Sequence, residues 1–339
     1  MKTELLEKLC GLNGTSGDEK SVREFILSEI SDFCDCIVDP LGNIIARKKG
    51  ASPAKNKVMV SAHMDEVGMI VTSVKSDGTL TVSPVGGVDP RAAIGRPVRV
   101  GDGLYGVIGA KAVHNLSDDE KKTAPKFTAL YADIGAQDKA EAEKLVSLGD
   151  RVHFVSDFIT FGDGFVKGKA IDDRFGCAVM IELIKSELPY DCIFTFVVQE
   201  EVGLRGSRTA AYTVDPDFAI VLEATTAADI PLASAEKRCC ELGKGAVVSY
   251  MDRSTIYDRE LYELSQKVSA DNGIKWQTKT MVAGGNDSGA IHISRGGVRT
   301  IAISAPCRYL HSPSCVVKLS DLEDCERLAK AMLEKMCML

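Results

Sequence analysis

The stretch KVMVSAHMDEVG, residues 57–68, decides the fold class of this chain. Its apolar run stops at His63, and Asp65 and Glu66 follow, so a buried strand carries polar groups to the edge of a sheet. Three further runs are apolar and rich in β-branched residues without alternation, namely residues 192–199, 217–223 and 298–304. Strands of this kind are covered on both faces. We therefore predict an α/β fold with a three-layer α/β/α domain.

Apolar residues at helical spacing predict the helices that cover this sheet. Near the start they recur over residues 22–30, with Ser16 and Asp18 upstream as expected cap residues. Near the end, Ser320 and Glu323 form a capping-box pattern before another apolar stripe. We expect both helices to belong to the scaffold.

The segment from residue 69 to 164 has a different character. It is rich in Gly and Val and carries turn signals at residues 76–78, 101–103 and 162–164. Short strands between tight turns predict a small β-barrel or sandwich, interrupted by one helical piece over residues 138–150. We therefore predict two domains. Residues 1–68 and 165–339 would form the α/β domain, and residues 69–164 an inserted β domain.

The composition excludes several classes of protein. The 339 residues include 41 basic and 48 acidic side chains, for a net charge of -7, so no extended basic surface for nucleic acid is expected. No apolar run approaches the length of a membrane span, and the first residues, MKTELLEKLC, lack the apolar core of a signal peptide. We expect a cytoplasmic protein that binds neither membrane nor nucleic acid.

The eleven cysteines are scattered and odd in number, which favours free thiols in a reducing compartment. Cys34 with Cys36, and Cys239 with Cys240, lie close in sequence, but neither pair has the CxxC spacing of a metal site. We expect all of them to be structural or incidental.

Each predicted core strand ends in histidine or acid. His63 ends the first strand, Glu200 and Glu201 follow the second, Glu223 ends the third, and His311 follows the fourth beyond a loop. The carboxyl ends of parallel strands meet at one edge of a sheet, where ligands bind. Two more acids, Asp172 and Asp173, precede a helical pattern over residues 175–186.

Each of these features has an ordinary explanation when it is taken alone. Paired acids cap a helix, two glutamates after a strand form a solvated loop, and a lone histidine is usually structural. Their coincidence favours a metal site, because the chain has only five histidines and two of them lie at strand ends. Imidazole with several carboxylates suits a two-metal site of Zn²⁺, Co²⁺ or Mn²⁺. The other three histidines, His114, His153 and His292, are predicted to be structural.

Seven motifs in order along the chain resemble the M42 family of metallo-aminopeptidases, some of whose members are labelled endoglucanases. They are AHMDEVG (62–68), PVGGVDPR (84–91), GKAIDDRFGC (168–177), QEEVGLRGS (199–207), TTAAD (225–229), GGNDSGAIH (284–292) and RYLHSP (308–313). The resemblance implies a zinc-peptidase-like catalytic domain with an inserted β domain that takes part in dimerisation and assembly. It also implies removal of N-terminal residues from peptides.

The resemblance assigns roles residue by residue. The implied metal ligands are His63, Asp172, Glu201, Glu223 and His311. Asp172 is implied to bridge two ions, Glu200 to act as general base toward a water held between the ions, and Asp65 to orient His63. Glu223 stands where many relatives carry Asp, and the loop GGNDSG departs from the commoner GGTD while keeping Asp287. The residues that bind substrate stay open, with the Asp287 loop as one candidate. Glu66 receives no role.

The resemblance further implies two divalent ions per chain, foremost Zn²⁺ or Co²⁺ and then Mn²⁺, with short peptides as substrates. It also implies a homo-oligomer, typically a dodecamer. The preferred first residue stays open, because acidic, basic and apolar residues are all served in the family. The expected pocket residues between Pro231 and Arg253 carry both signs of charge.

Three other functions stay open on the sequence. A glycosidase needs two carboxylates and usually an aromatic-lined cleft, whereas this chain has 6% aromatic residues and one Trp. A metal-dependent deacylase could use the same catalytic layer. A non-catalytic binding protein with this fold would be expected to have lost Glu200 or a ligand, and here all are present.

Overall fold

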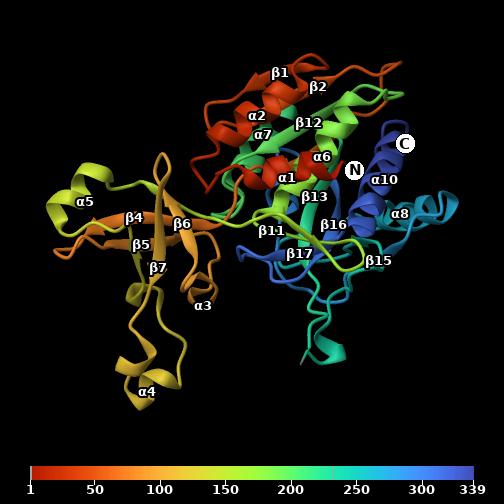
Figure 1. The fold of residues 1–339 in the computed structure, drawn as a ribbon. Helices are drawn as coiled ribbons and strands as arrows, with labels where there is room; N and C mark the ends of the chain where they lie inside the picture. The colour runs from red at the N-terminus through yellow and green to blue at the C-terminus, as the bar shows by residue number, and fades with distance from the viewer. Residues whose placement is uncertain (1, 232) are drawn as a thin grey trace.

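The computed structural model describes residues 2–231 and 233–339, and a large mixed sheet forms its centre (Figure 1). In spatial order the eight strands are β1 (Asp35–Val38), β2 (Ile44–Lys48), β12 (Cys192–Val197), β3 (Val58–His63), β13 (Phe218–Thr226), β16 (Arg299–Cys307), β14 (Ala246–Val248) and β15 (Trp276–Thr278). The four strands predicted from apolar runs, β12, β3, β13 and β16, are parallel neighbours at the centre of this sheet. Their carboxyl ends therefore lie along one edge, as the sequence predicts.

Side chains of the central strands alternate between two cores. Val58, Val60 and Ala62 of β3 enter the larger core, whereas Met59 enters a smaller one on the opposite face. The helices packed in the larger core are α1 (Thr3–Gly11), α2 (Lys20–Ile30), α6 (Ile171–Lys185), α8 (Arg259–Asp271) and α10 (Leu319–Met336). The helices on the smaller core are α7 (Arg205–Val214) and α9 (Ser288–Ile291). Burial on both faces explains why these strands carry apolar runs without alternation, and the α/β/α layering is confirmed.

A closed six-stranded barrel follows β3 and stands to one side of the large sheet (Figure 1). In order around the barrel its strands are β4 (Gly68–Val74), β5 (Leu80–Val85), β8 (Tyr131–Asp133), β7 (Leu104–Gly109), β6 (Pro97–Val100) and β9 (Arg151–Phe154). The barrel has its own apolar core, which includes Met69, Val82, Val98 and Ile108. The predicted small β-barrel is therefore present.

Three short α-helices and two 3₁₀ turns lie in the same part of the chain. They are α3 (Pro90–Ala93), α4 (Asp118–Lys121), α5 (Lys139–Leu145), η1 (Val113–Asn115) and η2 (Phe127–Ala129). A third 3₁₀ turn, η3 (Ala235–Lys237), lies between β13 and β14 in the sequence. Helix α5 falls within the predicted helical piece over residues 138–150.

A third sheet joins the segment after the barrel to the region before the last helix. It consists of β10 (Ile159–Phe161), β11 (Phe165–Gly168) and β17 (Cys315–Lys318), all antiparallel. Strand β10 lies in the range predicted as inserted, yet it pairs with β11 rather than with a barrel strand. The division at residues 68 and 164 stays a prediction.

Both predicted helix caps are wrong. Helix α2 begins at Lys20, and its cap residue is Glu19, without a side-chain cap bond. Ser16 instead donates its hydroxyl to Asp65, a contact between segments that helical periodicity does not reveal. Helix α10 begins at Leu319, so Ser320 lies inside the helix rather than at its cap. Helix α6 also begins earlier than the predicted range of residues 175–186.

The cysteine prediction agrees with the structure, in which all eleven cysteines are free. Cys34 and Cys36 bring their Sγ atoms to 3.6 Å, which is a non-bonded contact. No helix in residues 2–231 and 233–339 combines the length and the apolar character needed to cross a membrane.

Candidate active site

The carboxyl ends of the central strands bring together the side chains that the sequence analysis singled out. His63 is the last residue of β3 and lies opposite Val197 of β12, so Glu200 and Glu201, just beyond β12, emerge beside it. Glu223 lies on the neighbouring strand β13. The parallel register of the sheet thus produces the predicted cluster.

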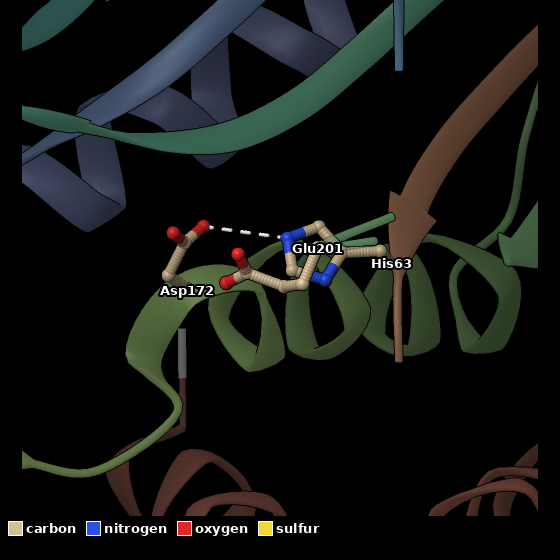
Figure 2. A group of neighbouring side chains, drawn as sticks. All are labelled: His63, Asp172 and Glu201. Atoms are coloured by element: carbon tan, nitrogen blue, oxygen red, sulfur yellow. Dashed lines mark ion pairs between the residues drawn. The ribbon is translucent and has the colours of Figure 1, made fainter. Parts of the chain in front are cut away.

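Asp172, at the start of α6, lies between the two histidines. Its Oδ1 is 3.4 Å from His63 Nε2, and its Oδ2 is 3.6 Å from His311 Nε2. Figure 2 shows His63 at the end of β3 facing Asp172, with Glu201 alongside. One carboxylate therefore presents each of its two oxygens to a different imidazole.

A further carboxylate accompanies each histidine. Glu223 Oε1 lies 3.5 Å from His63 Nε2, and Glu201 Oε2 lies 3.4 Å from His311 Nε2. Two groups of three residues each bring one possible ligand atom per residue within 4.8 Å of the other two. The first group is His63, Asp172 and Glu201, and the second is Asp172, Asp173 and Glu223. Asp172 belongs to both groups. We call the five predicted ligands and Glu200 the metal cluster.

These separations fit a metal better than direct hydrogen bonds. N–H···O bonds have donor–acceptor distances of about 2.7–3.2 Å, and the contacts around Asp172 are longer. Two ligands at tetrahedral angles around one Zn²⁺ lie roughly 3.3–3.6 Å apart, given metal–ligand distances of about 2.0–2.2 Å. His63 Nε2, Asp172 Oδ1 and Glu223 Oε2 are also buried without a hydrogen-bond partner. The residues present therefore fit a divalent cation.

The electrostatics of the cluster point the same way. Burial raises the pKa of Glu223 well above its ordinary value, and the Asp172 charge adds to this shift while His63 opposes it. Burial likewise raises the pKa of Glu201 to about 7, with His311 opposing and Asp172 adding. Carboxylates crowded in a buried site repel one another, so a bound cation would stabilise their ionised forms.

A comparison with known protein families identifies the family of this chain. The family model of M42 glutamyl aminopeptidases matches residues 42–328, which is most of the chain. The chain belongs to the M42 glutamyl aminopeptidase family. Its members are aminopeptidases and therefore hydrolyse peptide bonds, and the family is one of metallopeptidases, so divalent metal use follows.

Three M42 relatives match over nearly their full length. A protein of Acetivibrio thermocellus named "Putative aminopeptidase" is 40% identical, with 98% of each chain covered. The lysyl aminopeptidase of Pyrococcus furiosus is 33% identical, covering 98% of this chain and 97% of the relative. A solved TET1 peptidase of Pyrococcus horikoshii, described as assembling into a tetrahedron or a large octahedral shell, has a TM-score of 0.86 at 36% identity, covering 97% and 98% of the two chains.

In this M42 chain Asp65 links the loop of Glu200 and Glu201 to His63. Its Oδ1 accepts the backbone N–H of Glu200 at 3.0 Å, and its Oδ2 accepts that of Glu201 at 3.1 Å. Asp65 Oδ1 also lies 3.4 Å from His63 Nδ1, the ring nitrogen that points away from Asp172. Burial opposes ionisation of Asp65, but its contacts with His63 and Ser16 hold its pKa below the ordinary value. Asp65 thus contacts one histidine and the backbone of two glutamates.

Glu200 belongs to the same cluster, but no ion pair joins it to either histidine among the described residues. Burial raises the pKa of Glu200 well above its ordinary value; His63 opposes this shift, and Asp287 and Glu201 add to it. A carboxylate with a raised pKa in a cleft is suited to exchanging protons near neutral pH.

Two glycines of the family motifs are explained by close approaches. A Cβ at Gly176 would lie 2.4 Å from Oδ2 of Asp173, three residues earlier in α6, so glycine makes room for this carboxylate. A Cβ at Gly87, in the loop after barrel strand β5, would lie 2.9 Å from His311 Nδ1. The barrel loop therefore reaches the metal cluster. The Asp172–Asp173 peptide bond is cis.

The sequence analysis missed how the N-terminal loop supports the site. Ser16 donates its hydroxyl to Asp65 Oδ2 at 2.6 Å. Glu66, which had no role, accepts from the Gly14 N–H at 3.0 Å and from Lys169 Nζ at 2.7 Å. Arg174 Nη2 lies 3.5 Å from the same Glu66 oxygen. A buried charged residue directly after a strand was the available signal, but its partners lie far away in sequence.

We expect replacement of Glu66 by Gln to destabilise the protein strongly. The change leaves the buried Lys169 ammonium without its carboxylate, and breaking a buried pair in this way costs about 3–5 kcal/mol. Urea unfolding followed by the fluorescence of Trp276 in β15 measures the loss. The matched variant Glu187→Gln, on an exposed side chain, should change the free energy of unfolding by less than about 0.5 kcal/mol. Equal stability of the two variants would contradict the pairing.

A cavity of about 260 Å³ opens beside the metal cluster. Asp172, Glu200, Glu201, Glu223 and His311 all line it. Gly284, Gly285 and Asn286 of the GGNDSG loop line it too, whereas Asp287 is buried and is not among its lining residues. Of the described residues from 231 to 253, excluding residue 232, Cys239 lines the cavity.

The remaining histidines lie away from the metal cluster. His153 is buried on barrel strand β9, where its Nδ1 is 2.9 Å from the Thr15 hydroxyl. The Nδ1 of His292 lies 2.7 Å from the Ser288 carbonyl oxygen. His114 is exposed in η1. The structural role predicted for these three histidines stays a prediction.

Proposed function

We propose that this aminopeptidase is a dinuclear metallo-enzyme that removes single residues from the free N-termini of short peptides. The observation that carries the proposal is Asp172, whose two oxygens face two different histidines, each accompanied by its own glutamate. Such a set offers two three-ligand sites that share one bridging carboxylate.

In this proposal His63, Asp172 and Glu223 hold one ion, and His311, Asp172 and Glu201 hold the other. Two divalent ions, when bound, polarise the peptide carbonyl and acidify water. Nitrogen and carboxylate ligands suit Zn²⁺ and Co²⁺, with Mn²⁺ as a further choice. The longer arm of Glu223, where many relatives carry Asp, still places Oε1 at 3.5 Å from His63 Nε2.

Glu200 is the proposed general base. Its carboxylate takes a proton from the attacking water and later delivers that proton to the amine that leaves. Asp65 positions this step, because it anchors the backbone N–H groups of Glu200 and Glu201 and contacts the far side of His63. Both glutamates line the cavity, but among the described residues only Glu201 forms an ion pair with His311, so the two adjacent acids can have different tasks.

The proposed restriction to N-terminal residues follows from the shape of the site. Glu223 is the first of the β13 residues that line the cavity, and we propose that the free substrate amine lies near it with the first side chain along that wall. A cavity of about 260 Å³ is small, which favours a single side chain over a long peptide segment on that side.

We also propose a homo-oligomer. One solved relative assembles into a tetrahedron or an octahedral shell. A dodecamer is the smallest closed tetrahedral assembly of identical chains with equivalent positions, in line with the prediction from the sequence. Light scattering of the full chain tests this: a dodecameric mass supports it, and a stable monomer contradicts it.

The decisive test compares free and blocked substrates. We expect aminoacyl-p-nitroanilides to be hydrolysed and their N-acetylated forms to be cleaved at least about 100-fold more slowly, because blocking removes the charged amine. Activity should disappear on chelation and return with Zn²⁺, Co²⁺ or Mn²⁺. A preference for N-acyl substrates would indicate a deacylase. Activity on β-glucan that survives chelation would indicate a glycosidase, and either result would overturn the proposal.

A further inference from the structure

One pair of thiols stands apart from the other cysteines of the chain. Of the eleven free cysteines, nine are buried, whereas Cys34 and Cys36 are partly exposed. Cys34 lies in the bend between α2 and β1, and Cys36 is the second residue of β1. Strand β1 ends the spatial order of the large sheet, so this pair lies at an edge of the sheet and not at the metal cluster.

The two sulfur atoms of this pair face one another. Their Sγ atoms are 3.6 Å apart, close enough for one thiol to donate a weak hydrogen bond to the other. Residues two apart in extended backbone project to the same face, which explains how Cys34 and Cys36 meet across the exposed Asp35. A disulfide has an S–S distance of about 2.03–2.05 Å, so closing this pair requires an approach of about 1.5 Å.

The surroundings give the two thiols different reactivities. The hydrogen bond between them lowers the pKa of Cys36, although burial opposes this shift, and the same bond raises the pKa of Cys34. The thiolate is the reactive form of cysteine, so Cys36 is the better nucleophile and Cys34 is the thiol beside it. The buried cysteines lack this advantage, since burial raises the pKa of Cys10, for example, to about 12. An accessible nucleophilic thiol next to a second thiol is the arrangement of a redox-reactive pair.

We propose that Cys34 and Cys36 form a reversible redox site, which closes to an intramolecular disulfide by exchange with a low-molecular-weight disulfide such as oxidised glutathione. The Cys36 thiolate attacks one sulfur of the oxidant, forming a mixed disulfide and expelling one thiolate. Cys34 loses its proton and attacks the Cys36 sulfur, which expels the second thiolate. The two cysteines together lose two electrons and two protons, and the oxidant is reduced to two thiols. This site is independent of the proposed peptidase chemistry.

The test treats the folded full-length chain with oxidised glutathione, blocks the remaining thiols with a maleimide in denaturant, and analyses tryptic peptides by mass spectrometry. Trypsin releases residues 24–47 as one peptide that contains Cys34 and Cys36 and no other cysteine. We expect this peptide to escape the maleimide and to be lighter than its reduced form by two hydrogen atoms, and dithiothreitol should restore both thiols. It should oxidise at least about tenfold faster than any peptide with a buried cysteine, because those thiols are shielded from the oxidant.

Two single variants separate the roles of the thiols, with circular dichroism that matches the parent as evidence of folding. Cys34→Ser should retain one glutathione on Cys36, because no second thiol resolves the mixed disulfide. Cys36→Ser should gain glutathione on Cys34 at least about tenfold more slowly, because Cys34 is the weaker nucleophile. Two free thiols in the treated parent peptide, a separate glutathione on each cysteine, or oxidation of the buried cysteines at the same rate would overturn the inference. Faster reaction of Cys36→Ser than of Cys34→Ser would contradict the assignment of Cys36 as the nucleophile.

Discussion

Replacing Glu200 by Gln is expected to lower kcat by about 10³-fold while metal content stays that of the parent. General acid–base catalysis contributes about 10²–10⁴-fold, and Gln cannot take up the water's proton. Glu200 lines the cavity, and among the described residues no ion pair joins it to either histidine, so its replacement should not remove a metal ligand. Steady-state kinetics with an aminoacyl-p-nitroanilide, together with metal analysis by mass spectrometry, gives both quantities on one sample.

The matched change Glu7→Gln, on an exposed side chain of α1, should leave kcat and metal content at parental values. If Glu200→Gln lost metal in proportion to activity, Glu200 would be a ligand, and the roles of Glu200 and Glu201 would have to be exchanged. If it kept parental kcat, the proton transfer would belong to another group.

Replacing Asp172 by Asn is expected to reduce both metal binding and turnover. The neutral amide offers one oxygen where the carboxylate presents two, so the bridge between the His63 and His311 ligand sets is lost. Replacing a residue that only hydrogen-bonds to a metal ligand already lowers metal affinity by about 10–100-fold. Replacing the shared ligand itself should therefore lower metal affinity by at least about 100-fold. Metal titration followed by calorimetry should show weakened binding at both sites, and kcat should fall with occupancy.

Asp102→Asn, on an exposed side chain of the barrel, is the corresponding control and should bind metal as the parent does. Circular dichroism that matches the parent would show that Asp172→Asn is folded. Two tightly bound ions per chain in the folded Asp172→Asn protein would exclude Asp172 as the bridge.

The candidate metal ligands at the strand ends could be predicted from the sequence, because their positions follow from the order and register of the strands. His63, Glu201 and Glu223 come directly at or after apolar runs, and parallel strands place their carboxyl ends together. Asp172 could be predicted because it is one of two adjacent acids before a helix. Only the folded structure shows that its two oxygens face two different histidines.

The rest depended on contacts between segments far apart in sequence. The sequence pattern predicted Ser16 as a helix cap. Its hydroxyl instead donates to Asp65, because the loop before α2 packs against the residues that follow β3. Glu66 gained a role only through Lys169 and Gly14. Cys34 and Cys36 are close in sequence, but only the folded chain shows that their sulfur atoms face one another.

In the proposed mechanism, peptide hydrolysis requires two ions bound around Asp172. The most direct measurement removes metal with a chelator and then follows aminoacyl-p-nitroanilide hydrolysis while Zn²⁺ or Co²⁺ is titrated back and counted per chain. The account predicts no activity in the stripped protein and a maximum when two ions are bound to each chain. Full activity in the stripped protein, or a maximum reached with a single ion that the Asp172→Asn variant also binds, would contradict it.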